Sequence, residues 1–200
     1  MTIIAFISQK GGVGKSTLAQ SLASEAKRQK KKVLLADCDS QQATSLEWSK
    51  LNKKVPCQVF NSAKEVWPLS KDYDLIIIDG PARTSSGTLE IAKKADLVIQ
   101  PTGASRADLI PAVKEFNALK KAGIPTKKLL FVLTRLSTSA EAKAIQEYLT
   151  NTGYAYSPNH LMEKASYKQI QNEGKSITET KYLNLAKQAR QVINSLLDHL

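Results

Sequence analysis

Residues 10 to 17 read Lys-Gly-Gly-Val-Gly-Lys-Ser-Thr, a run in which three glycines separate side chains that bind phosphate. Glycine lacks a Cβ, so this segment can curl tightly and bring several backbone N–H groups toward one anion. The N-terminus of a following helix would attract the same anion. These residue types at this spacing favour binding of a nucleotide's phosphates.

Each polar side chain of this loop has its own expected role. Lys15 would reach the β- and γ-phosphates, Ser16 would place its hydroxyl on Mg²⁺, and Thr17 would support the phosphates from the first helical turn. The backbone that surrounds the phosphates would come from Gly11, Gly12, Val13 and Gly14. The general pattern has glycine where this chain has Gln9, and a second lysine, Lys10, follows it. On the motif alone, Lys10 is either accidental or the mark of a variant loop.

Carboxylates follow two apolar runs. Asp37 and Asp39 come after the run 33–36, and alternation puts both on one side of an extended segment, where a shared cation would relieve their repulsion. Asp79 follows the apolar run 75–78, an arrangement typical of a strand whose carboxylate contacts a Mg²⁺ shell. The alternative for each is an ordinary polar turn. Residues 80–87 are small and polar, and we expect a flexible loop there.

Together these residues resemble the deviant Walker A family, which includes ParA-type partition ATPases, MinD-type ATPases and the nitrogenase iron protein. K-G-G-x-G-K-[ST] is the family signature, and 37–42 is close to its D-x-D-P-Q, with Ser40 in place of proline. The resemblance implies that Lys10 crosses a dimer interface to the partner's ATP. It also implies that Asp37 holds Mg²⁺ through water and that Asp39 orients the attacking water. Lys10, Lys15 and Asp39 are thus the catalytic candidates, and Ser16, Asp37 and Asp79 the metal candidates.

Strands and helices are expected to alternate along the chain. The apolar run 3–7 precedes the loop, and Leu18, Leu22 and Ala26 form a helical stripe after it. Further strands are expected at Leu97–Thr102, Leu129–Leu133 and 154–156, with helices at 109–121 and 141–149. This order predicts an α/β fold with a doubly wound, mostly parallel sheet flanked by helices. Residues 1–200 suit one P-loop ATPase domain of the deviant Walker A type.

The residues that would bind adenine are the hardest to predict from the sequence. In related ATPases the base lies near the ends of later strands. The candidates are therefore Thr134, Arg135, the loop 101–105 and nearby Asp108. Arg135 could stack on the base through its planar guanidinium, although a surface arginine would look the same in sequence.

Net charge suggests a polyanionic partner. The chain has 29 Lys and Arg against 18 Asp and Glu, a formal charge of +11. Residues 163–177 resemble the family's late R-x-x-Y…G-x-S-[VI] region, with Lys164 in place of arginine. That resemblance predicts nonspecific DNA binding by Lys164, Lys168 and Lys175, against the alternative of a solubilising surface. The basic end of the first helix, 27–32, is expected to be solvated.

Other features mainly exclude functions. Cys38 and Cys57 form no C-x-x-C pair, and the later cysteines that the iron protein's cluster needs are missing. His160 and His199 receive no catalytic role. Few cysteines and no apolar run of about 18 residues predict a reduced, cytoplasmic protein. The DNA binding that the resemblance implies would make it nucleoid-associated. An amphipathic stripe over 183–197 predicts a helix docked on the sheet, or else a membrane-gripping helix of the MinD type.

The function expected is that of a ParA-like ATPase with ATP and Mg²⁺ as cofactors. It would dimerise on ATP, coat DNA nonspecifically and release it when a ParB-like or small adaptor protein stimulates hydrolysis. Its cargo would be a plasmid, a chromosome or another body. The alternatives are a MinD-like membrane-positioning ATPase and an ATP-dependent ligase resembling dethiobiotin synthetase.

Overall fold

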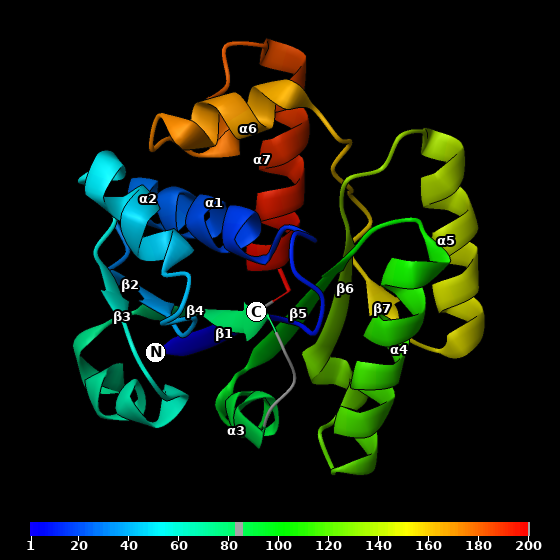
Figure 1. Cartoon of the computed structure of the whole chain (residues 1–200), viewed down its shortest axis with the longest axis horizontal. Helices are drawn as coiled ribbons and strands as arrows, with labels where there is room; N and C mark the ends of the chain where they lie inside the picture. The colour runs from blue at the N-terminus through cyan, green and yellow to red at the C-terminus, as the bar shows by residue number, and fades with distance from the viewer. Residues whose placement is uncertain (83–85, 200) are drawn as a thin grey trace.

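The computed structural model describes residues 1–82 and 86–199, and for Ser86 only its backbone. Along these residues strands and helices alternate from end to end (Figure 1). The strands are β1 (Thr2–Ser8), β2 (Val33–Asp37), β3 (Cys57–Val59), β4 (Leu75–Ala82), β5 (Leu97–Thr102), β6 (Leu129–Leu133) and β7 (Ala155–Tyr156). The α-helices are α1 (Lys15–Arg28), α2 (Thr44–Asn52), α3 (Ser86–Lys94), α4 (Arg106–Lys121), α5 (Ser139–Thr152), α6 (Ala165–Asn172) and α7 (Leu183–Leu197).

These strands form one sheet in the order β3-β2-β4-β1-β5-β6-β7. Neighbouring strands pair in parallel, for example Ile4 with Ile77 and Leu97 on either side of it. The central strands are buried along nearly their whole length, as parallel strands covered on both faces must be. The predicted doubly wound parallel sheet is confirmed. Its order places the carboxyl ends of β1, β2 and β4 side by side.

Two apolar cores lie on opposite faces of the sheet. One contains alternate strand residues such as Ile76 and Ile78 together with the buried faces of α3, α4 and α5. The other contains Ile77 and Phe6 with the buried faces of α1, α2, α6 and α7. Because successive strand residues point to opposite faces, the same strands supply both cores. The loop after β1 therefore enters α1 on the second face, where α6 also lies.

The segment after Asp79 differs from the expected flexible loop over 80–87. β4 continues to Ala82, which pairs with Ser8 after an irregularity in the register, and α3 begins at Ser86. Gly80 permits this, since a Cβ there would stand 2.7 Å from the Phe6 carbonyl oxygen. The expected loop is thus wrong at both of its ends. Arg83, Thr84 and Ser85, which belonged to that prediction, lie outside the described residues.

The C-terminal stripe packs on the sheet. Ala189, Val192, Ile193 and Leu196 of α7 are buried in the second core, while Leu183 at its start is 82% exposed. The docked orientation is therefore the one that the fold adopts. None of the helices within the described residues is long and apolar enough to cross a membrane.

Candidate functional site

The glycine-rich loop joins β1 to α1, so the strand–loop–helix context that the motif requires is present. Gly12 has φ 76° and Gly14 has φ 100°, values in the left-handed region that favour glycine. Gly14 is also the N-cap of α1, and its backbone carbonyl accepts the first helical bond, from Leu18. The loop thereby directs its N–H groups and the helix N-terminus toward one point.

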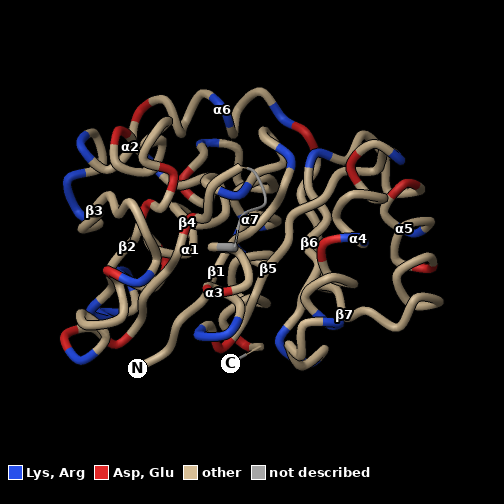
Figure 2. The backbone as a smooth tube through the Cα atoms, turned by 60° about the horizontal axis from the view of Figure 1, so that its bottom comes forward, with Lys and Arg blue, Asp and Glu red and all other residues tan. Residues whose placement is uncertain are grey.

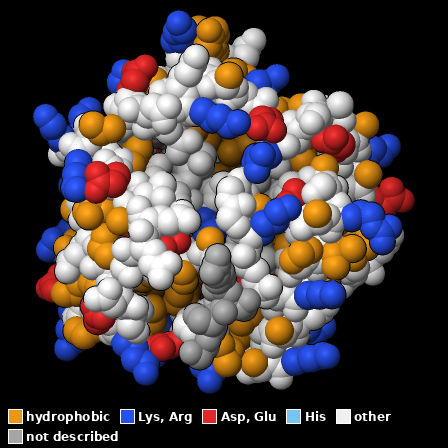
Figure 3. Space-filling view, viewed as in Figure 1, with side chains coloured by type: hydrophobic (Ala, Val, Ile, Leu, Met, Phe, Trp, Pro, Cys, Tyr) orange, Lys and Arg blue, Asp and Glu red, His pale blue; other side chains and the backbone are white. Residues whose placement is uncertain are grey.

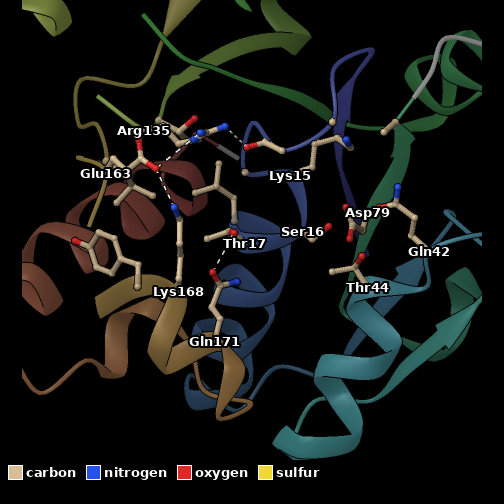
Figure 4. A pocket seen from close by; sticks show the side chains of 18 of the residues that line it. Lys15, Ser16, Thr17, Gln42, Thr44, Asp79, Arg135, Glu163, Lys168 and Gln171 are labelled. Carbon is tan, nitrogen blue, oxygen red and sulfur yellow. Dashed lines mark hydrogen bonds and ion pairs between the residues drawn. The ribbon is translucent and has the colours of Figure 1, made fainter. Parts of the chain in front are cut away.

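A cavity of about 470 Å³ lies over this loop (Figure 4). One side is formed by the phosphate-binding motif and the acidic strand ends, and the other by the segment between β7 and the end of α6. Its polar lining includes Gly11, Gly12, Gly14, Lys15, Ser16, Thr17, Asp37, Asp39, Asp79, Thr134, Arg135, Glu163, Lys164, Lys168 and Gln171. The fold therefore brings together nearly all of the predicted phosphate and metal residues.

Lys15 is a buried cation in this cavity, with 7% of its surface exposed. Burial lowers its pKa, and the carboxylates of Asp79, Asp39 and Glu115 act in the opposite direction. A desolvated ammonium group in a polar cavity gains most from an anion placed beside it. The geometry suits a phosphate group better than a neutral ligand.

Asp79, at the end of the apolar part of β4, has one occupied and one free carboxylate oxygen. Its Oδ2 accepts from the Ser45 hydroxyl at 2.7 Å, whereas its Oδ1 is buried without a partner among the described residues. Burial raises the pKa of Asp79 to about 6, and the hydroxyls of Ser45 and Ser16 partly offset this rise. A buried, unpartnered carboxylate oxygen beside Ser16 fits the coordination shell of a cation.

Asp37 differs from Asp79 in that its carboxylate accepts hydrogen bonds from backbone N–H groups. Its carboxylate accepts three backbone N–H groups, from Ser45 at 2.8 Å and from Asp39 and Leu46 at 3.1 Å each. These bonds tie the end of β2 to the first turn of α2. Burial raises the pKa of Asp37, and the same N–H groups oppose that rise. Asp37 thus organises the acidic edge of the cavity as well as lining it.

Asp39 connects the two strand ends. Its carboxylate accepts from the Gln42 backbone N–H at 3.3 Å and from that of Ala82 at 3.4 Å. Its own carbonyl accepts from Ala43, which has φ 46°. Because Asp39 is only half-buried, its carboxylate remains accessible from the cavity.

The described residues hold no group of three or more His, Cys, Asp or Glu side chains arranged to bind a metal by themselves. Mg²⁺ does not require such a cage, since it commonly keeps several waters and binds one or two carboxylates together with substrate phosphates. The hydroxyl of Ser16 and the free Oδ1 of Asp79 are the groups that fit it here. Asp37 lines the same cavity, and its contact with Mg²⁺ through water stays a prediction.

Lys10 lies on the rim, outside the set that lines the cavity. Its ammonium group forms an ion pair with Asp108, the third residue of α4. Asp108 also accepts from the Ser105 hydroxyl at 2.8 Å. Although burial acts to raise the pKa of Asp108, the hydrogen bonds from Lys10 and Ser105 hold it below its usual value. In the isolated chain Lys10 is thus held against its own α4.

The adenine candidates fall into two groups. Thr134 and Arg135 line the cavity, but the Thr134 hydroxyl donates to the Val13 carbonyl at 2.7 Å and Arg135 Nη1 donates to that of Gly12 at 2.8 Å. These side chains therefore support the phosphate-binding loop. The loop 101–105 is outside the described lining and carries the N-cap of α4, Ser105.

Two of the three DNA-binding candidates line the cavity, and the third is outside its lining. Lys164 and Lys168 line the cavity. Lys168 Nζ pairs with Glu163 Oε1 at 2.9 Å, and Arg135 Nη2 lies 3.8 Å from the same oxygen (Figure 4). Lys175 lies elsewhere and pairs with Glu173 at 2.8 Å. Basic side chains are spread along many elements and are interspersed with acidic ones (Figures 2 and 3).

Several site residues were missed from the sequence. Glu115 of α4 is 2% exposed, and its Oε2 accepts from the Gln9 backbone N–H at 3.2 Å and from Gln100 Nε2 at 2.8 Å. Burial raises its pKa to about 7. Its signal was present, since Glu115 falls on the same helical stripe as Ala112, Phe116 and Leu119. Ser45, Gln20 and Gln171 carried no comparable signal.

Comparison with known proteins agrees with this geometry. A family model described as the CobQ/CobB/MinD/ParA nucleotide binding domain matches residues 4–177. Uncharacterized protein BBD21 of Borreliella burgdorferi is 56% identical over 48 residues, which are 24% of this chain and 19% of that protein. Maintenance of carboxysome distribution protein A of Gloeobacter kilaueensis is 29% identical over 157 residues, covering 74% of this chain and 69% of that one. The MinD cell division protein structure from Aquifex aeolicus has a TM-score of 0.77 at 18% identity, covering 99% and 97% of the two chains.

Proposed function

Since the chain belongs to the CobQ/CobB/MinD/ParA nucleotide-binding domain family, we propose that it is a Mg²⁺-dependent, ParA-like ATPase that positions or segregates a cargo. The observation that carries this proposal is the meeting of Lys15, Ser16 and Asp79 in one cavity at the carboxyl ends of β1 and β4. In open parallel sheets this is the edge at which ligands bind.

ATP would enter with its phosphates on the loop and its base toward the α6 side of the cavity. Lys15 and the N–H groups of 11–14 would bind the phosphates, and Asp39 would orient the attacking water. Mg²⁺, when bound through Ser16 and Asp79, would neutralise charge on the phosphates. Because the carboxylates of Asp39 and Asp79 already accept hydrogen bonds, they would need little reorganisation at the moment of reaction.

Dimerisation would supply the missing cation. Lys10 is exposed on the rim beside Asp108 and would leave that carboxylate to reach the ATP of a second copy. A lysine beside the transferring phosphoryl group stabilises the charge that develops there. ATP would therefore control association, and a ParB-like or small adaptor protein would stimulate turnover.

Nonspecific DNA is the proposed platform, and the cytoplasmic nucleoid the proposed location. The support is the formal charge of +11 together with exposed Lys164, Lys168 and Lys175. Plasmid, chromosome and carboxysome are all cargoes that this function would serve. A membrane platform is less well supported, because the apolar stripe of α7 is buried in the second core.

The test of the proposed function is ATP-dependent dimerisation. The wild type should change from monomer to dimer in light scattering when ATP and Mg²⁺ are added. Lys10→Ala should bind ATP in calorimetry yet remain monomeric, whereas Lys143→Ala, an exposed lysine of α5, should behave as wild type. Dimers that persist in Lys10→Ala would contradict the sandwich.

A second measurement tests the DNA platform. In the ATP-bound state, replacing Lys164 or Lys168 with alanine should reduce the log–log salt slope of DNA binding by roughly 0.9 per lost phosphate contact. Because both side chains also line the cavity, ATP affinity must be measured for each variant alongside. An unchanged slope would remove that lysine from the DNA surface, and binding to anionic liposomes instead would favour the membrane alternative.

A further inference from the structure

Ser45, the second residue of α2, bridges the two buried carboxylates of the acidic edge. Its backbone N–H donates to Asp37 Oδ2 at 2.8 Å, and its hydroxyl donates to Asp79 Oδ2 at 2.7 Å. Ser45, Asp37 and Asp79 are 0%, 0% and 2% exposed. The Ser45 hydroxyl therefore helps to fix the orientation of the Asp79 carboxylate.

The orientation has a consequence for the other oxygen. With Oδ2 engaged by Ser45, the Oδ1 of Asp79 is left buried and without a partner among the described residues. A buried carboxylate oxygen without a hydrogen-bond partner costs free energy. If the Asp79 carboxylate could rotate freely, each of its oxygens would therefore accept a hydrogen bond in turn. Ser45 thus keeps Oδ1 available on the side where Ser16 lies.

A chain of amide hydrogen bonds supports the Ser45 hydroxyl. Gln20 Nε2 donates to Ser45 Oγ at 3.3 Å, and Gln171 Nε2 donates to Gln20 Oε1 at 2.9 Å. Thr17 in turn donates its hydroxyl to Gln171 Oε1 at 3.1 Å (Figure 4). These hydrogen bonds all donate in the same direction. They run from Thr17 of α1 to Gln171 of α6, back to Gln20 of α1, and then through Ser45 to Asp79. Since Ser45 Oγ accepts from Gln20, its single proton is committed to Asp79.

We infer that Ser45 is a positioning residue for the cation site: through Asp79 it presets the oxygen that receives Mg²⁺, and Gln20 fixes the direction of its hydroxyl. The inference rests on the proposed function, because it presumes that Mg²⁺ enters with ATP. It adds residues outside the phosphate-binding loop and the acidic strand ends to the working site. Partners that orient metal-binding carboxylates typically contribute 10- to 100-fold to metal affinity.

The test measures Mg²⁺ dependence of ATP binding, without turnover. ATP affinity is measured by calorimetry over a series of Mg²⁺ concentrations and in EDTA, for the wild type and for Ser45→Ala. We expect Ser45→Ala to bind ATP as the wild type does in EDTA, while its half-saturating Mg²⁺ concentration rises roughly 10- to 100-fold. An equal loss of affinity in EDTA and in Mg²⁺ would indicate general disruption and overturn the inference.

Ser49→Ala is the matched control. Ser49 lies one turn further along α2, is 9% exposed, and donates its hydroxyl to the Leu46 carbonyl at 2.8 Å. It should leave the Mg²⁺ response unchanged. A shift in Ser49→Ala as large as that in Ser45→Ala would overturn the inference, since any loosening of α2 would then suffice.

Gln20→Leu keeps the inference falsifiable if Ser45→Ala does not fold. It retains the Ser45 hydroxyl and removes the donor that aims it, together with the oxygen that accepts from Gln171, so the half-saturating Mg²⁺ concentration should rise several-fold. No rise would overturn the inference. A wild type that binds ATP with no Mg²⁺ dependence would overturn the proposed function and this inference together. A Mg²⁺-dependent wild type with a normal Ser45→Ala would overturn this inference alone.

Discussion

The two sides of the cavity are built on opposite principles. On the phosphate side, Lys15, Asp79 and Ser45 are buried, and the Ser45 hydroxyl donates to Asp79 at 2.7 Å. On the α6 side, Lys164 and Lys168 are exposed, and Lys168 forms an ion pair with Glu163. Buried polar groups have few alternative hydrogen-bond partners, whereas exposed ion pairs contribute little to stability and exchange partners readily. We therefore expect the phosphate side to be rigid and the α6 side to adapt to what binds it.

The largest difference should come from lysine substitutions on the two sides. Lys15→Ala should weaken ATP binding by about 100-fold or more, because charge-assisted hydrogen bonds to phosphate each contribute about 1.5–3 kcal/mol. Lys168→Ala should change it by no more than a few-fold. Isothermal titration calorimetry measures both. Similar losses in the two variants would contradict the contrast between a rigid and an adaptable side.

Gly174 tests whether the segment after α6 is structural. With φ 74°, Gly174 packs on α2, where an added Cβ would collide with Leu51 and stand 2.7 Å from the Leu51 carbonyl carbon. Gly174→Ala should lower the free energy of unfolding by about 2–3 kcal/mol, since strain and overpacking add. Gly153→Ala is the control, with the same φ of 74° and no atom within 4 Å of the added Cβ. Equal losses in urea unfolding would show that packing on α2 contributes nothing.

Glu115 tests the buried side through pH. Its pKa is raised from 4.5 to about 7 in the folded chain, so the native state binds the extra proton and loses stability as pH rises through that window. Glu115→Gln has no carboxyl group at this position, so its stability does not fall for this reason as the pH rises. The variant's stability relative to wild type should improve by about 2–3 kcal/mol between pH 5 and pH 8 in urea unfolding. Exposed Glu147→Gln should show no such trend, and a flat difference for Glu115→Gln would place its carboxylate in water.

The smallest effect concerns the rim. Asp108→Asn should release Lys10 and strengthen ATP-dependent dimerisation about two- to five-fold, the range expected when a partly exposed ion pair is lost. Sedimentation equilibrium with ATP measures this. Glu173→Gln, which breaks the exposed Lys175 pair, is the control. Weaker dimers in Asp108→Asn would mean that Asp108 assists Lys10 instead of holding it back.

The contrast also explains what could be predicted from sequence. The loop 10–17 and the strand ends at Asp37 and Asp79 have obligatory geometry, because glycines and long apolar runs leave few conformations. β3 has three residues, too few for a period, and α6 has only eight residues, of which Tyr167 is the buried one, so neither was predicted from the sequence.

Long-range contacts account for the rest. Ser45 resembles any other serine until β2 and β4 bring Asp37 and Asp79 to it. The motif Gly174-Lys175-Ser176-Ile177 has a structural explanation as well: Gly174 packs on α2, Ser176 caps a short 3₁₀ helix (Ile177–Glu179), and Ile177 is fully buried. Pairing of Lys168 with Glu163 depends on flexible exposed side chains, which no sequence period encodes.

The indole of Trp48 lies one turn after Ser45, is 5% exposed, and donates to the Lys175 carbonyl at 3.2 Å. It therefore spans the junction between α2 and the segment that follows α6. Trp67 packs against the opposite core, so Trp67→Phe leaves Trp48 as the sole strong fluorophore. In this variant, any ligand that shifts α2 relative to that segment will therefore change the fluorescence emission of Trp48.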